Sequence, residues 1–171
     1  DKLCADRIVR PETRVCLADS ILGVGVREGA PKPDVSTVEA FKRTLVAARA
    51  VAYSKAGASG IYFTGLVERL GIAAEVNARA VTIPMGFTGE KVASGEADIA
   101  IQQVSELMSV PGVAVAGPFP PEVQTVSTFD AAIFADAKNA EGAAAFMALL
   151  ASPEAAKAYG DGGLVSRLKH S

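Results

Sequence analysis

The chain has 171 residues, half of them hydrophobic, and its 17 basic and 19 acidic side chains leave a net charge of -2. This length fits one ordinary domain or two small lobes with a real core. The near-neutral balance, without clustered Lys and Arg, argues against a nucleic-acid-binding protein. No apolar run approaches the roughly 20 residues of a membrane span.

The sequence offers few side chains for a metal site or for a catalytic triad. Cys4 and Cys16 are the two cysteines, and His170, next to the C-terminus, is the one histidine. The cysteines could form a disulfide or be two buried thiols, and their spacing leaves both open. A zinc site would need more ligands, and a lone tail histidine is a poor general base. We therefore expect no metal and no cofactor.

Short strands and helices alternate through the first two thirds of the chain. Gly23 and Gly25 lie in an apolar strand and permit close backbone approach. Ser36 with Glu39 has the pattern of a capping box before a helix. We predict strands at 21–29, 48–54, 80–84, 97–103 and 113–120, and further helices near 59–70 and 86–96. This alternation is typical of parallel strands with crossover helices, so we expect an α/β fold with a mainly parallel sheet over residues 30–115.

The last third of the chain has a different pattern. QTVSTFDAAIFADA at 124–137 is extended in character, and two helical segments follow it, NAEGAAAFMALLAS and PEAAKAYGDGG. Ser152 and Pro153 suit the N-cap and first turn of the second helix. This part is expected to form a separate layer.

The stretch SKAGASGIYFT at 54–64 predicts a helix that begins near Ser59 and ends at Gly71, as a C-cap glycine would. Its small residues leave first-turn N–H groups uncovered, which suits an anion or a carbonyl oxygen. The alternative is a permissive loop before an ordinary helix. If the first interpretation holds, bulky residues at Gly57 or Gly60 should abolish binding and leave the fold largely intact.

The order of four segments carries a resemblance. ILGVGVREG, SKAGASGIYFTGLVERLGI, EKVASGEADIAIQQVSEL and AAAFMALLASPEAAKAYGDGGL together resemble the type 2 periplasmic binding fold, most closely the molybdate-binding branch of ABC importers. The resemblance covers about residues 17–164. It implies a complete second α/β lobe at 27–117, with 1–26 and 118–171 as crossing strands and part of a first lobe. An N-terminal part of that lobe is then expected to be missing, and exposed apolar edges make a homo-oligomer possible.

The resemblance also implies how a ligand is held. In this family a cleft between lobes grips an oxyanion without metal, through backbone N–H groups and small hydroxyl donors. Ser20, like Arg27, lies near the first crossing strand and could line the hinge. The residues that match the helix entrance of the family are Gly57, Ala58, Ser59 and Gly60.

Gln103 falls where molybdate binders carry a tyrosine hydroxyl. A glutamine amide both donates and accepts, so it suits a carboxylate, amide or hydroxyl-bearing solute at least as well as a tetrahedral oxyanion. Gln102 and Gln103 alternate along a strand, so one of them faces the cleft, and Gln103 is favoured. Tyr62 is expected to pack, and Lys55 to be solvated.

Three functions are open at this point. The leading one is a periplasmic solute-binding component that passes a small oxyanion or polar carboxylate metabolite to an inner-membrane ABC permease, and this function predicts no enzymatic activity. The second is the effector-binding domain of a LysR-type transcription regulator, which shares the fold. The third is a proton-transfer enzyme of isomerase type that reuses the cleft, with Tyr62, Asp98 or Glu106 as acid or base.

Overall fold

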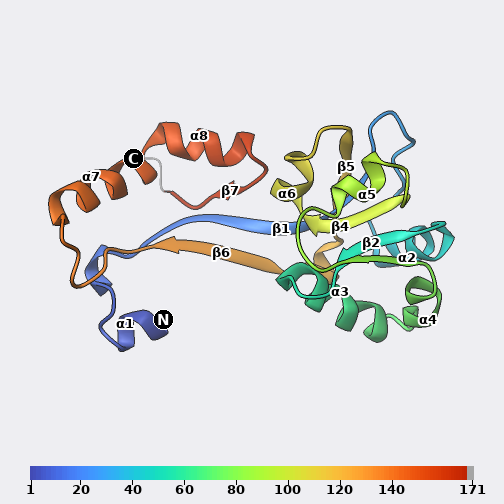
Figure 1. Cartoon of the computed structure of the whole chain (residues 1–171), viewed down its shortest axis with the longest axis horizontal. Coiled ribbons are helices and arrows are strands. Elements are labelled where there is room, and N and C mark those ends of the chain that lie inside the picture. The colour runs from blue at the N-terminus through green and yellow to red at the C-terminus, as the bar shows by residue number, and fades with distance from the viewer. Residues whose placement is uncertain (169–171) are drawn as a thin grey trace. The chain divides into compact units, whose positions relative to one another are not determined.

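A computed structural model describes residues 1–168 (Figure 1). The chain divides into two units: unit 2 is Ile21–Val126, and unit 1 is Asp1–Ser20 with the described residues after Val126. The lobe boundaries expected at residues 27 and 117 stay a prediction. The elements in chain order are α1 (Lys2–Ala5), η1 (Pro11–Thr13), β1 (Val15–Arg27), α2 (Val38–Ala47), β2 (Val51–Ser54), α3 (Ala58–Arg69), α4 (Ala73–Asn77), β3 (Ala80–Ile83), α5 (Gly89–Ala93), β4 (Ile99–Gln103), α6 (Val104–Met108), β5 (Val113–Pro118), η2 (Pro121–Val123), β6 (Val126–Ala131), α7 (Ala140–Leu150), α8 (Pro153–Asp161) and β7 (Val165–Ser166).

Unit 2 is built on strands in the order β3-β2-β4-β1-β5. β2 pairs in parallel with β3 on one side and with β4 on the other. β1 runs antiparallel to both β4 and β5. The α/β fold is therefore confirmed, and both pairings between strands that lie within residues 30–115 are parallel, whereas the sheet as a whole is mixed because β1 is antiparallel to its neighbours. Because parallel strands end at the same edge of a sheet, Ser54, Ile83 and Gln103 share one edge, which we call the carboxyl rim.

Helices cover both faces of this sheet. Figure 1 shows α2, α3 and α4 on one face and α5 and α6 on the other. On the first face the ring of Phe119 lies 4.7 Å from that of Phe41 and 6.4 Å from that of Phe63, centroid to centroid. On the second face Val92 and Leu107 form a smaller buried cluster with alanines of the sheet. The loops after β2 and β4 consequently leave the sheet toward opposite faces.

The glycines of β1 permit the close approach that the sequence predicts, and the element that lies directly against the strand there is α6. A Cβ atom on Gly23 would lie 2.7 Å from Val104 Cγ2, and one on Gly25 would lie 2.7 Å from Leu107 Cδ2. Both separations are shorter than real Cβ contacts, so a side chain at either position would force the Val104 or Leu107 side chain of α6 to move. Close packing of α6 keeps its first turn at the carboxyl rim.

Several predicted boundaries need correction. The N-cap of α2 is Thr37, whose side chain accepts a hydrogen bond from the Ala40 N–H. Ser36 instead donates its N–H and its hydroxyl to Asp34, and these two bonds lower the pKa of the Asp34 carboxyl. The helix predicted within 86–96 is shorter, α5 at 89–93. The short helices α4 and α6 were not predicted.

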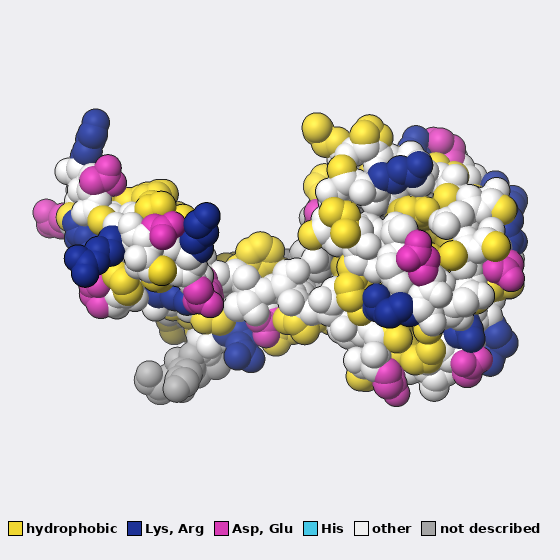
Figure 2. All heavy atoms as spheres, turned by 90° about the horizontal axis from the view of Figure 1, so that it is seen from below, with side chains coloured by type: hydrophobic (Ala, Val, Ile, Leu, Met, Phe, Trp, Pro, Cys, Tyr) yellow, Lys and Arg dark blue, Asp and Glu magenta, His cyan; other side chains and the backbone are white. Residues whose placement is uncertain are grey.

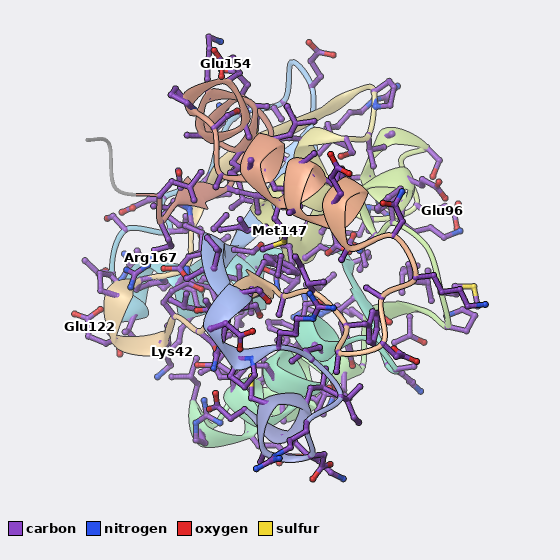
Figure 3. All side chains as sticks on the ribbon, turned by 90° about the vertical axis from the view of Figure 1, so that its left-hand side faces the viewer. Lys42, Glu96, Glu122, Met147, Glu154 and Arg167 are labelled. Atoms are coloured by element: carbon purple, nitrogen blue, oxygen red, sulfur yellow. The ribbon has the colours of Figure 1, made fainter. Side chains whose placement is uncertain are left out.

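In unit 1, β6 and β7 pair with β1. Arg167, labelled in Figure 3, lies 3.6 Å from the Asp19 carboxylate and joins the segment after β7 to β1. The second predicted helix is confirmed as α8, where the Ser152 hydroxyl accepts from the Ala155 N–H. α7 leaves Phe146 and Leu149 about 60% exposed (59% and 60%).

The two cysteines are free thiols in this structure, and both are partly exposed. Cys4 and Cys16 therefore do not form the disulfide that the sequence left open. His170, the other residue considered for metal or acid–base chemistry, lies outside the described residues.

Candidate functional site

The entrance of α3 lies at the carboxyl rim and has no side-chain cap. Gly57 is the N-cap residue, in extended conformation with φ -73° and ψ 152°. By contrast, α2, α7 and α8 begin with side-chain caps from Thr37, Asn139 and Ser152. First-turn N–H groups have no partner inside a helix. Without a cap, those of residues 58–60 point out of the helix end, and such a group of donors suits a carboxylate or another anion.

This entrance is held firmly on the end of β2. The Gly57 N–H donates to the Ser54 hydroxyl at 3.1 Å. A Cβ atom on Gly60 would lie 1.4 Å from the Ser54 carbonyl oxygen, which is a backbone atom. The expectation that a bulky residue at Gly60 would leave the fold intact is therefore wrong. At Gly57 a Cβ atom would lie 3.2 Å from the Ser54 hydroxyl, a tight contact that a side chain can relieve.

The two consecutive glutamines of β4 have different environments. Gln102 is 4% exposed, and its Oε1 accepts from the Thr88 N–H at 2.7 Å and from the Thr88 hydroxyl at 2.9 Å. Its Nε2 donates to the Gly86 carbonyl at 3.2 Å. Gln102 therefore holds the loop that follows β3. Gln103, which is partly exposed, lies at the end of β4 on the carboxyl rim, and its role as a ligand residue stays a prediction.

Gln103 and Glu106 form a reciprocal cap at the start of α6. The Gln103 side chain accepts from the Glu106 N–H, and the Glu106 carboxylate accepts from the Gln103 N–H at 3.3 Å. This arrangement fixes a partly exposed carboxylate at the carboxyl rim, beyond the strand next to β2. The site thus combines N–H donors on the β2 side with a proton acceptor on the β4 side.

The position between β2 and β4 is a topological switch point. The chain leaves β2 toward one face of the sheet and leaves β4 toward the other (Figure 1). In α/β proteins, ligands bind outside the carboxyl ends of strands at such points. The switch point therefore makes this end of unit 2, with the α3 donors on the β2 side and Glu106 on the β4 side, the candidate place for an anionic ligand.

Other residues considered from the sequence lie elsewhere or have structural partners. The Tyr62 hydroxyl donates to the Val123 carbonyl at 3.0 Å, and Arg69 lies 5.4 Å from the centre of its ring, which fits the predicted packing role. Asp98 pairs with Arg49 at the opposite edge of the sheet, so it is not part of the rim. Ser20 is 1% exposed within β1, and Lys55 is exposed in the loop after β2.

Within residues 1–168 no cluster of three or more His, Cys, Asp or Glu side chains is placed to hold a metal ion. None of the helices in the same residues is both long and apolar enough to cross a membrane.

Replacing Gln102 tests the anchoring of the loop after β3. Gln102→Leu should lower the free energy of unfolding by about 1 to 3 kcal/mol, because the buried Thr88 N–H loses its acceptor. The double variant Gln102→Leu with Thr88→Val should lose less than the sum of the two single variants, since paired groups are not additive. Urea unfolding of the four proteins measures this, and an unchanged midpoint for Gln102→Leu would contradict the anchoring role.

The fold is that of the type 2 periplasmic binding proteins. Two solved structures carry this comparison. The chain superposes on a substrate-binding domain of a putative molybdenum ABC transporter from Clostridium difficile with a TM-score of 0.74 and 18% identity, over 96% of this chain and 71% of that one. It superposes on the periplasmic molybdate-binding protein of Azotobacter vinelandii with a TM-score of 0.68 and 22% identity, over 96% and 72%.

Residues 1–165 match the family described as bacterial extracellular solute-binding protein, and the chain belongs to that family. A relative from Pseudomonas sp, named aconitate isomerase, is 41% identical over 165 residues, which are 96% of this chain. The chain spans 63% of that relative's length.

This relative corrects the expectation that the chain is not an enzyme. An isomerase is an enzyme, and a 41% identical protein with that name conflicts with a purely binding function. An isomerase-type enzyme with Glu106 as one candidate acid or base was among the three functions open from the sequence, but Glu106 three residues after Gln103 has the same pattern as a simple helix cap, so no motif favoured that function.

Proposed function

We propose that the chain carries the substrate site of an isomerase that acts on aconitate or a closely similar tricarboxylate. The observation that carries this proposal is the 41% identity to a protein named aconitate isomerase. The carboxyl rim supports it, because its donors suit carboxylates and Glu106 supplies a base. Since the chain spans 63% of the relative's length, the proposal is limited to the part of the substrate site that residues of this chain form.

Aconitate can change its geometry by a proton shift alone. It is a propene that bears three carboxylates. Its central carbon is joined by a double bond to a vinyl CH carbon and by a single bond to a methylene carbon. A base removes a methylene proton, and the electron pair spreads over the three-carbon unit. A proton then returns to the former vinyl carbon while the double bond moves. The product is again aconitate. It is the other isomer when the carboxylates across the new double bond take the opposite cis or trans arrangement.

The residues of the rim have distinct roles in this proposal. The N–H groups of Ala58, Ser59 and Gly60 hold a substrate carboxylate and stabilise the negative charge that develops on it when the proton leaves. Glu106 is the base that takes the methylene proton, and in protonated form it returns a proton to the other carbon. Its N–H donor, Gln103, keeps the carboxylate oriented in the first turn of α6.

The test is direct conversion of substrate. The purified protein, incubated with cis-aconitate, should produce trans-aconitate, and proton NMR resolves the vinyl signals of the two isomers. A substrate with a deuterated methylene group should give a product whose vinyl carbon carries deuterium, because the proton shift turns the methylene carbon into the vinyl carbon. A product that keeps both deuterium atoms on its methylene group would point to rotation about the double bond by another route, and no conversion at all would overturn the proposal.

A second candidate is solute capture for an ABC importer, which the family favours. It would involve an inner-membrane permease as partner, a periplasmic location, and a small oxyanion or carboxylate bound without conversion. Calorimetric titration with aconitate, molybdate, tungstate and sulfate separates the two functions. Tight binding of an oxyanion with no change in any aconitate isomer would favour the importer function.

A further inference from the structure

A pocket of about 590 Å³ lies at the edge of unit 2 opposite the carboxyl rim. It is bounded by the end of β1, the loop that follows, the end of α2 and the beginning of β4. Its floor is apolar and well buried, formed by side chains that are at most 8% exposed: Val26, Ala48, Val92, Ala97 and Ile99. An apolar floor of this size can receive a ring or a short alkyl chain.

Three arginines and one aspartate stand around this floor: Arg27, Arg43, Arg49 and Asp98. The Arg49 guanidinium donates to Asp98 at 3.0 Å and to the Gly95 carbonyl at 2.9 Å, and the Arg49 N–H donates to Asp98 at 2.8 Å. The opposite charges of Arg49 and Asp98 neutralise each other, and the pair forms one fixed wall of the pocket.

The other two arginines keep their charges available. Within residues 1–168, neither the Arg27 nor the Arg43 guanidinium has a hydrogen bond or an ion pair. Arg43 acts on the Asp34 carboxyl through its charge alone, and Asp34 is already bonded to Ser36. Figure 2 shows Lys and Arg side chains along the right-hand edge of unit 2, the end at which β2 and β4 begin in Figure 1.

We propose that this pocket binds a small organic anion, with a phosphate or carboxylate group held by Arg27 and Arg43 and an apolar body on the floor. The planar guanidinium matches phosphate and carboxylate oxygens with two parallel donors, and it is more weakly hydrated than an ammonium group. Two unpaired arginines beside a buried apolar surface therefore select a ligand that has both parts. The site is separate from the carboxyl rim and does not depend on the proposed isomerase function.

Titration with phenyl phosphate, followed by amide chemical shifts of the whole chain, tests the site. The amides of Ala47, Gly95 and Ala97 should shift, and inorganic phosphate should bind at least ten-fold more weakly because it leaves the floor uncovered. Phthalate, titrated in parallel, distinguishes a carboxylate ligand from a phosphate ligand, and binding of either one here supports the site. Shifts confined to residues outside the pocket would overturn it.

Matched variants separate the charge from the floor. Arg27→Gln with Arg43→Gln should weaken phenyl phosphate binding at least ten-fold. Lys42→Gln removes a positive charge from the neighbouring position of α2, outside the pocket lining, and should leave binding unchanged. Ala47→Phe fills the pocket from an exposed position and should weaken binding while all the arginines remain. Equal affinity in the wild type and the double variant would refute the proposal.

Discussion

Gly60→Ala should prevent stable folding of unit 2, although it adds a single methyl group. The new carbon would lie 1.4 Å from the Ser54 carbonyl oxygen and 2.5 Å from its carbonyl carbon. Neither atom can rotate away, because both belong to the backbone at the end of β2. The first turn of α3 would have to leave the sheet and expose part of the core that includes Phe63. We expect a loss of more than about 3 kcal/mol, at the upper end of overpacking effects.

Two other glycines of the same region serve as controls. A Cβ atom on Gly65 meets only the end of Arg69 at 3.6 Å, so Gly65→Ala should stabilise the protein by about 0.5 to 1 kcal/mol through helix propensity. Gly57→Ala should cost little, because its close neighbour is the Ser54 hydroxyl. Circular dichroism during urea unfolding ranks the three variants. A Gly60→Ala protein as stable as Gly57→Ala would show that α3 is not held against β2 in this way.

The fold could be predicted from the sequence where one residue carries a strong local preference. Gly71 has a positive φ of 68° just after α3, which is the C-terminal signal that the sequence contains. Pro153 after Ser152 likewise marks the start of α8. The helices α4 and α6 have five residues each, too few to show a helical period of apolar side chains.

The site was predictable only in part, for a physical reason. Alternation along β4 shows that Gln102 and Gln103 face opposite ways, but it does not show which one meets the loop after β3. That choice depends on Thr88, which is fourteen residues earlier and comes close only when β3 and α5 are in place. The role that we propose for Glu106 depends in the same way on β4 lying next to β2.

Glu106→Gln should abolish most of the proposed isomerase activity and leave the structure unchanged. A glutamine oxygen can accept the Gln103 N–H as the carboxylate does, so the reciprocal cap of α6 is retained. An amide, however, cannot take a proton from carbon. General-base catalysis typically contributes 10²- to 10⁴-fold, and we expect kcat to fall by about that factor.

The kinetic pattern tells a base from a residue that only binds or supports the rim. Loss of an interaction made only in the transition state lowers kcat and kcat/KM equally, with KM unchanged. Glu68→Gln, an exposed carboxylate on α3, is the matched control and should keep the wild-type rate. Tyr62→Phe should lose stability rather than rate, because the hydroxyl donates to the Val123 carbonyl. If Glu106→Gln isomerises aconitate as fast as the wild type, the base is another group, whereas a raised KM at constant kcat would make Glu106 a binding residue only.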